Sequence, residues 1–424
     1  MVAEMILAVF VITYVAISSE KVNRTATALL GMGVVGIVLW ATGTAEFKEV
    51  ADRIEWSTIL FVTSMFIIVT IAASSGMFQY LALELTRRTE GDTKRLFISL
   101  LAFVFVISLF FDTTSTMLIM GPLTIEICKA LEIDFRPFLI SEAVTCNFAS
   151  VPSIVGAVPN LLIAEQAHVD PGFLFESLMP LSVVLFLVSV PLLLRVFGDQ
   201  LKPSEEYLVS QMMLISPQYM IRSRRDFYLS IIAMFILVLG FTFGPAYDLQ
   251  PAVIAITVAA GLLLLAREWV DEILKRVNWG TIFFLIGLFG LIAALDITDI
   301  IIGLGEAIGG LIQGNVLFGI VFMIWVPALL SAVIDNIPVS AVLAPIAAQF
   351  AAISPLLSIA LIFAVNVGGF LLPIGSPANI LALAFSEKEH RPIRMVDFAK
   401  IATPLGFLML TIATGWLLLL GVLI

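Results

Sequence analysis

The stretch FDTTSTMLIMGP, residues 111–122, places an aspartate, three threonines and a serine inside a segment that is otherwise apolar enough for a lipid bilayer. A second stretch, IDNIPVSAVLAP at 334–345, repeats this pattern 223 positions later. A charged side chain at the bilayer centre costs at least about 2.5–3.5 kcal/mol, so such residues normally face a cavity and have a function. Asp112 and Asp335 therefore indicate two equivalent points at which an apolar segment is interrupted.

The composition indicates a membrane protein. Sixty per cent of the 424 residues are hydrophobic and 13% are charged, whereas soluble domains carry about 25% charged residues. Many runs reach the roughly 20 apolar residues that one spanning helix needs. We expect an all-α polytopic membrane protein with about ten transmembrane helices, near residues 5–19, 25–42, 56–74, 137–166, 173–197, 227–241, 251–266, 279–295, 356–384 and 401–424.

Two further apolar segments, 96–127 and 316–350, contain the two aspartates and can either cross once or enter and return as re-entrant hairpins. Charge decides between these alternatives. If both are hairpins and the N-terminus lies outside, only Lys48 and Arg53 of the 22 basic residues fall outside the cytoplasm. A plain crossing at either segment would spoil this pattern. We therefore predict two hairpins with polar tips in the plasma (inner) membrane, with both termini outside.

Internal symmetry divides the chain. The stretch IEWSTILFVTSMF (54–66) resembles VNWGTIFFLIGLF (277–289), and NFASVPSIVGAVPN (147–160) aligns with NVGGFLLPIGSPAN (366–379). We expect a first repeat at 1–198, a cytoplasmic linker at 199–226 and a second repeat at 227–424, with five spans and one hairpin in each repeat. An odd number of spans puts the two repeats in opposite orientation. Inverted repeats with broken helices are typical of secondary transporters.

The candidate site residues lie at the hairpin tips and at the Gly/Pro-rich breaks of the fourth and ninth spans. The two aspartates either bind a proton or cation or cap the half-helices at the tips. The asparagines at the breaks either hold a solute or only satisfy the broken backbone. The residues expected to bind the solute or ion are Asp112, Thr113, Thr114, Thr116, Asn147, Asn160, Asp335, Asn336, Asn366, Gly375, Ser376 and Asn379.

Glu142 is a candidate for a proton relay, because it lies in an apolar context five residues before Asn147; a hydrogen-bonded packing role is the alternative. Two cysteines and two histidines give no disulfide framework and no metal-binding pattern, so no metal or cofactor is expected. Two amphipathic stretches, 78–88 and 267–277, are expected to lie in the membrane interface.

These paired stretches resemble the ion transporter superfamily, and within it the arsenite efflux permeases (ArsB type) and the related melanosomal P-protein and plant silicon-efflux branches. The resemblance implies a scaffold part and a transport part made of two re-entrant hairpins and two broken helices. It also implies that the tip positions fall on Asp112, Asp335 and Asn336. The broken-helix positions fall on Asn147, Asn366, Gly368, Gly369, Gly375, Ser376, Pro377 and Asn379.

The expected function is secondary transport and not enzymatic catalysis, with arsenite or antimonite leaving as a neutral hydroxide in exchange for protons. The alternatives are a sodium–proton antiporter or a sodium-coupled carboxylate carrier, an intramembrane aspartyl protease with two aspartates as a dyad, and a passive channel. The chain has no G-x-x-x-x-G-K-[ST] loop, so any use of ATP would need a separate cytoplasmic ATPase subunit. The expected partners are the solute, protons or sodium, and the bilayer; no nucleic acid is expected.

Overall fold

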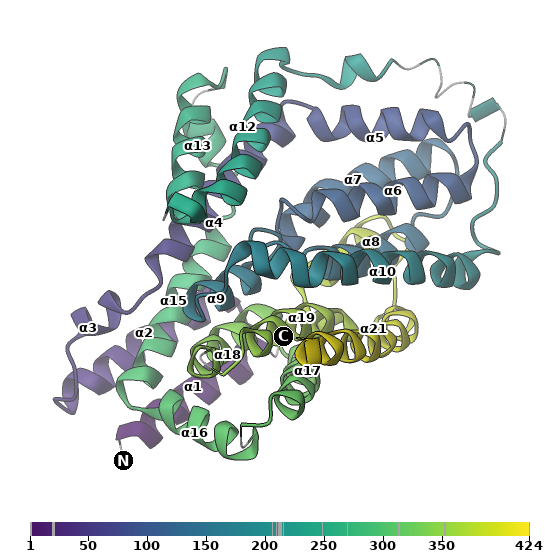
Figure 1. Cartoon of the computed structure of the whole chain (residues 1–424). Coiled ribbons are helices and arrows are strands. Elements are labelled where there is room, and N and C mark those ends of the chain that lie inside the picture. The colour runs from purple at the N-terminus through teal and green to yellow at the C-terminus, as the bar shows by residue number, and fades with distance from the viewer. Residues whose placement is uncertain are drawn as a thin grey trace.

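The structure is a computed structural model that describes residues 2–18, 22–205, 207–208, 210, 214, 216–247, 249–268, 270–312, 314–351 and 353–423. Parts of the expected linker, at 206, 209, 211–213 and 215, lie outside these ranges. Every regular element within them is helical (Figure 1), which confirms the all-α expectation.

The helices of the first half are α1 (Val2–Ser18), α2 (Arg24–Ala41), α3 (Phe47–Asp52), α4 (Trp56–Ser74), α5 (Met77–Arg88), α6 (Thr93–Ile107), α7 (Thr113–Ala130), α8 (Arg136–Ala149), α9 (Val158–Gln166) and α10 (Pro171–Phe197). Those of the second half are α12 (Arg224–Phe243), α13 (Pro251–Leu265), α14 (Val270–Leu274), α15 (Trp279–Ile297), α16 (Ile300–Ile312), α17 (Val316–Val333), α18 (Asn336–Phe350), α19 (Pro355–Leu371), α20 (Pro377–Lys388) and α21 (Met395–Leu423). Short 3₁₀ turns occupy Pro217–Met220, Gly244–Tyr247 and Pro373–Gly375.

The two halves contain the same succession of helices. Trp56 begins α4 and Trp279 begins α15, which is 223 positions later, and the same offset leads from Thr93 of α6 to Val316 of α17. An offset of 219 leads from the start of α8 to that of α19, and from the start of α9 to that of α20. The sequence likeness therefore extends to nearly every helix boundary.

Both expected hairpin segments consist of two helices separated by a short break. The break between α6 and α7 spans 108–112, and that between α17 and α18 spans 334–335. The expected spans 137–166 and 356–384 are also interrupted, by 150–157 and by 372–376. Proline stands in the first turn of both returning half-helices, as Pro159 and Pro377, where its missing N–H would have had no helical partner.

Among the described helices, α16 and the six-residue α3 were not expected from the sequence. The stretch 78–88 does form the amphipathic α5, but its counterpart in the second half is α16. Of the described residues in the other expected stretch, 267–277, those in a helix are Val270–Leu274. Four glycines in IIIGLGEAIGGLI weaken the helical signal of α16. The amphipathic pair therefore precedes the hairpin in each half, at matching positions.

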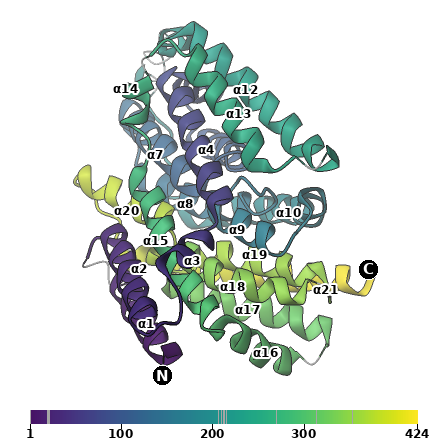
Figure 2. The same cartoon turned by 90° about the vertical axis from the view of Figure 1, so that its left-hand side faces the viewer.

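The broken helices lie at the centre of the molecule. In α8 all residues from Pro137 to Ala149 are buried, and in α19 all residues from Leu356 to Leu371 are buried. The helix pairs α2–α15 and α4–α13 pack beside this centre, together with α1 and α12 (Figures 1 and 2). We call α1, α2, α4, α12, α13 and α15 the outer helices, and α8, α9, α19 and α20 the crossed helices.

The apolar surface agrees with a membrane environment. Six helices in the described residues, α2, α4, α10, α15, α17 and α21, are long and apolar enough to cross a bilayer. Many of their large side chains face outward, for example Trp40 of α2, which is 72% exposed, and Leu187 of α10, which is 64% exposed. A soluble monomer rarely exposes apolar patches of this extent, so the chain is an integral membrane protein.

Candidate solute-binding site

Asp112 caps the returning helix of the first hairpin. Its Oδ1 accepts hydrogen bonds from the backbone N–H groups of Thr114 (3.0 Å) and Ser115 (3.1 Å), and its Oδ2 accepts one from the Ser115 hydroxyl. A carboxylate at this N-cap position satisfies backbone donors that the first helical turn leaves free. The capping alternative is therefore realised at this tip.

Asp335 caps α18 in the same way but has a further contact. Its Oδ1 accepts from the backbone N–H of Ile337 at 3.0 Å, and its Oδ2 lies 3.4 Å from Nη1 of Arg24. The guanidinium of Arg24, at the start of α2, also lies over the Phe284 ring of α15, 5.4 Å from its centroid. From the sequence, Arg24 counted only as one of the cytoplasmic basic residues and was not expected in the site. Its position at the start of an apolar helix was the feature that could have indicated a buried contact.

Asparagines from the two halves are paired at the centre. Nδ2 of Asn366 in α19 donates to Oδ1 of Asn160 in α9 at 2.6 Å. Nδ2 of Asn147 in α8 donates to Oδ1 of Asn379 in α20 at 3.3 Å. Each pair joins the broken helix of one half to that of the other, so the structure brings all four predicted asparagines to one place.

The second asparagine of each pair also satisfies the broken backbone. Nδ2 of Asn160 donates to the carbonyls of Ser150 and Ser153, both at 2.8 Å. Nδ2 of Asn379 donates to the carbonyls of Gly369 (2.9 Å) and Leu372 (3.2 Å). A break inside an apolar interior leaves carbonyl groups without helical partners, and these two amides supply donors for them.

Polar atoms without a partner remain beside these pairs. Oδ1 of Asn147, Oδ1 of Asn366, Nδ2 of Asn336 and Oγ of Ser376 are buried and find no hydrogen-bond partner within the described part of the chain. Their residues are at most 2% exposed. Buried polar atoms normally have partners, so a set without them marks a place for water or a bound polar molecule.

Two glycines allow each hairpin to contact the broken helix of its own half. A Cβ on Gly375 would lie 2.4 Å from the Ser331 carbonyl oxygen, and one on Gly156 would lie 2.6 Å from the Ser108 carbonyl oxygen. Backbone carbonyls cannot move aside as a flexible side chain can, so only glycine fits. Gly375, one of the predicted site residues, therefore lies at a close approach of two backbones.

The environments of the two tips differ. A cavity of about 450 Å³ lies beside the second tip, lined by Asp335, Arg24, Tyr14 and Pro377, and by Thr114 from the first hairpin. Beside the first tip, the space next to Asp112 is only about 10 Å³ and is closed by aromatic side chains, Phe61, Phe66 and Phe111. Of the two tip aspartates, Asp335 is the one that lines a cavity large enough for a small solute.

Two of the predicted threonines are placed away from this cavity. Thr113 is 5% exposed and Thr116 is fully buried. The hydroxyl of Thr116 lies 3.5 Å from the carbonyl oxygen of Phe111, a back-bond to its own hairpin. Of the three predicted threonines, Thr114 is the one that lines the cavity.

Glu142 is a fully buried carboxyl on α8. Its Oε1 accepts a 2.6 Å hydrogen bond from the Thr124 hydroxyl of α7, and its Oε2 has no partner within the described ranges. The corresponding residue of α19, 219 positions later, is Leu361. The first half therefore carries an ionisable group that the second half lacks.

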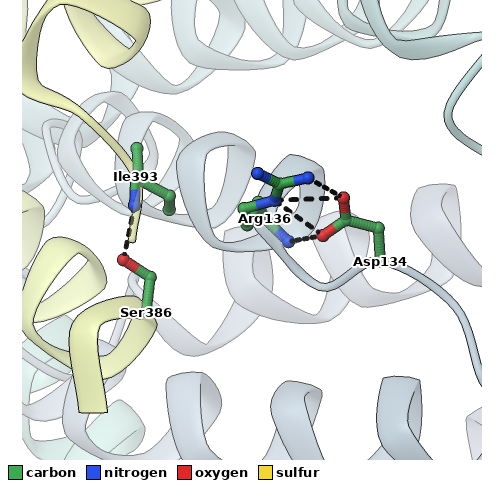
Figure 3. Close-up of polar contacts among 4 residues, drawn as sticks. All are labelled: Asp134, Arg136, Ser386 and Ile393. Atoms are coloured by element: carbon green, nitrogen blue, oxygen red, sulfur yellow. Dashed lines mark hydrogen bonds and ion pairs between the residues drawn. The ribbon is translucent and has the colours of Figure 1, made fainter. Parts of the chain in front are cut away.

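Polar contacts fix the outer ends of α8 and α20 (Figure 3). The Asp134 carboxylate accepts a forked set of hydrogen bonds from the Arg136 guanidinium, the shortest 2.6 Å, while Oγ of Ser386 accepts from the Ile393 backbone N–H at 2.9 Å. Partial burial acts to raise the pKa of Asp134, but the hydrogen bonds and charge of Arg136 outweigh it and hold that pKa below its usual value.

Comparison with known proteins gives a consistent class of relatives. The profile of the citrate transporter family (CitMHS) matches residues 14–356. A 46 kDa membrane protein of Mycobacterium leprae is 28% identical over 398 residues, which cover 92% of both chains. An uncharacterized transporter of Synechocystis is 24% identical over 448 residues and 97% of both chains. The human P protein is 27% identical over 489 residues, which cover 96% of this chain and 58% of that protein.

Proposed function

This chain belongs to the citrate transporter (CitMHS) family and is a membrane transporter, and we propose that it is a secondary transporter working by alternating access between two inverted repeats. The observation that carries this proposal is the crossed pairing of Asn366 with Asn160 and of Asn147 with Asn379. A solute at this junction would contact both halves. Movement of the two halves relative to each other can then expose it to either side.

We place the repeats at 1–198 and 227–424, with the linker 199–226 in the cytoplasm and both termini outside, in the plasma membrane. The two helix–break–helix segments would be re-entrant hairpins that approach the site from opposite faces. Their support is the charge distribution of the sequence together with the matching helix boundaries of the two halves.

For the substrate, we put arsenite or antimonite first, as an uncharged hydroxide exported in exchange for protons. The buried groups without partners, on Asn147, Asn366, Asn336 and Ser376, are amides and a hydroxyl, all neutral. A hydroxide such as As(OH)₃ both donates and accepts hydrogen bonds, so it complements amide oxygens and amide N–H groups together. The likeness to ArsB-type permeases supports the same choice.

The carboxyl groups would provide the proton coupling. Glu142 is buried with one neutral hydrogen-bond donor, the Thr124 hydroxyl, and a buried carboxylate is costly unless it is paired or binds a cation. Asp112 and Asp335 lie at the two hairpin tips. We assign Glu142 to the proton path along α8 and the two aspartates to the cation or proton sites of their own halves.

A small carboxylate such as citrate is the second candidate substrate, with protons or sodium as the driving ion. Two observations favour it: the matching family profile is that of a citrate transporter, and the cavity contains a guanidinium, that of Arg24. In this alternative Arg24 would attract the anion towards the second tip.

Transport into proteoliposomes across an imposed pH gradient tests these assignments, with arsenite, antimonite, citrate and sodium as separate arms. We expect arsenite accumulation that depends on the gradient, is lost in Asn366→Ala, and is retained in Asn315→Ser, which keeps an N-cap outside the site. Gradient-driven citrate accumulation without arsenite transport would show that citrate, and not arsenite, is the substrate. Arsenite movement that ignores the gradient, or persists fully in Asn366→Ala, would contradict the proposal.

A further inference from the structure

The contact between Arg24 and Asp335 joins an outer helix to a hairpin tip. Arg24 begins α2, and Asp335 lies between α17 and α18. The two side chains are 3.4 Å apart, with Arg24 36% exposed and Asp335 14% exposed. The Phe284 ring of α15 also contacts the guanidinium, in a cation–π arrangement. This ion pair therefore connects α2, one of the outer helices, with the tip of the second hairpin.

The first tip has a different arrangement. Asp112 accepts hydrogen bonds from Thr114 and Ser115, both in its own hairpin. In the second half the counterpart of α2 is α13, and it begins with Pro251, which carries no charge. The ion pair is thus a feature of the second tip that the repeat symmetry does not generate.

The ion pair coincides with the open side of the structure. The cavity of about 450 Å³ is lined by both of its members, whereas the space beside Asp112 is closed to about 10 Å³. Moving the second tip away from α2 with Asp335 still charged would leave a partly buried carboxylate without this partner. Losing a cationic partner raises the free energy of a partly buried carboxylate.

We propose that the Arg24–Asp335 ion pair is a latch that holds the second hairpin tip against α2 while this cavity is open, and that a transported cation releases it by taking the place of Arg24 on Asp335. The proposal rests on the proposed transport function and adds to it the device that couples cation binding to movement. The cation is a proton or a sodium ion, because either one can neutralise the Asp335 carboxylate.

The surroundings of Asp335 fit this exchange. Among the described residues that line the cavity, Tyr14 of α1 and Arg24 are the titratable side chains besides Asp335, and Asn278, which precedes α15, contributes a neutral amide. With the cation bound, Asp335 no longer needs the guanidinium and the tip is free to leave. Without a cation the tip stays, so the empty site does not leak charge across the membrane.

A labelling experiment tests the latch without measuring transport. Val333→Cys places a thiol on the cavity lining, where Val333 is 55% exposed, and its reaction rate with a membrane-impermeant maleimide reports how much of the protein has this cavity open. The native thiols, Cys128 and Cys146, are buried. Rates are measured at several pH values without sodium, and at fixed pH with increasing sodium. Each rate is divided by that of the same thiol in the unfolded protein at the same pH, because the thiolate that reacts with maleimide becomes scarcer as the pH falls.

In the otherwise unaltered protein we expect labelling to slow as the pH falls or as sodium is added, and the arm that responds identifies the cation. In Arg24→Gln we expect labelling about two- to fivefold slower, the range that a partly exposed ion pair supports. In Asp335→Asn we expect slow labelling that responds to neither cation. The exchanged pair, Arg24→Asp with Asp335→Arg, should restore the rate of the unaltered protein.

The control is Arg53→Gln, which removes a more exposed ion pair, with Asp296 of α15, away from the residues that line the cavity. It should label as fast as the protein with Arg53. If Arg24→Gln labels at that same rate, or if Asp335→Asn keeps the full cation response, the latch is wrong. Unfolding midpoints and gel filtration show whether each variant is folded. If the protein transports a solute but Arg24→Gln does not change the labelling rate, the latch is wrong and the proposed transport function stands.

Discussion

Asn366 donates a 2.6 Å hydrogen bond to Oδ1 of Asn160, a residue 206 positions earlier in the chain. The partner bond from Asn147 to Asn379 spans 232 positions and is longer, at 3.3 Å. Both donors are single amides that bridge two broken helices. The centre of the molecule is therefore held by side-chain amides at the places where helical backbone bonds are missing.

This difference in length predicts unequal stabilities. Asn366→Ala removes the bond to Asn160 and leaves a buried oxygen without a donor, which costs about 1–3 kcal/mol. Asn147→Ala removes the weaker bond, so we expect a smaller loss. Chemical unfolding of the purified protein in detergent measures both, and the double variants with Asn160→Ala and Asn379→Ala give the coupling energies. A larger coupling for the Asn147–Asn379 pair would contradict the expectation.

Gly375→Ala is expected to abolish correct packing of the second hairpin. The added Cβ would lie 2.4 Å from the Ser331 carbonyl oxygen and 2.7 Å from that of Gly369, so two backbone segments would have to separate. Gly415→Ala is the matched control, because its Cβ meets nothing within 4 Å and alanine favours the helix. We expect the first variant to lose most of its monodisperse yield and the second to retain it; equal yields would show that the hairpin can shift.

The fold could be anticipated because its signals are local. The interruptions at Asp112 and Asp335, and the Gly/Pro-rich stretches 147–160 and 366–379, coincide with the four breaks within the hairpins and the broken helices. The helix α16 was missed for the same reason, since its four glycines resemble a loop. The internal symmetry would have predicted α16, because α5 lies 223 positions before it.

The site could be anticipated only in part. Asn147, Asn160, Asn366 and Asn379 stood out as amides in apolar context, but nothing local shows that they pair across the two halves. Arg24 was missed as a partner of Asp335 because 311 positions separate them. Such contacts depend on how the helices pack, and a single sequence does not contain that information.

Thr124 is expected to govern the behaviour of Glu142. Its hydroxyl is the donor to Oε1 at 2.6 Å, so Thr124→Val leaves the carboxyl without that bond in an apolar site, while Thr124→Ser keeps a hydroxyl. If Glu142 carries protons, Thr124→Val should shift the pH dependence of transport and Thr124→Ser should not. Glu142→Gln should remove that pH dependence. If transport has the same pH dependence in all three variants as in the unaltered protein, Glu142 has only a packing role.

The ion pair between Asp134 and Arg136 predicts a pH-dependent stability at the start of α8. Arg136 lowers the pKa of Asp134 in the folded protein despite the opposing effect of partial burial. A lowered carboxyl pKa contributes stability that is present above the unfolded pKa, about 3.9, and is lost as the pH falls through the folded value. The Arg136→Gln variant should therefore unfold at a lower temperature than the protein with Arg136 at pH 7, by an amount that shrinks below about pH 4.

Thermal unfolding in detergent between pH 7 and pH 3 measures this difference directly. Arg95→Gln is a suitable control, because the Arg95–Asp92 pair is more exposed, at 69% and 47%, than the Arg136–Asp134 pair, at 44% and 19%. Water screens exposed pairs strongly, so the control should change the midpoint little at any pH. A constant gap between Arg136→Gln and the unaltered protein across the whole range would mean that Arg136 acts by packing, and that the charge on Asp134 does not fix the first turn of α8.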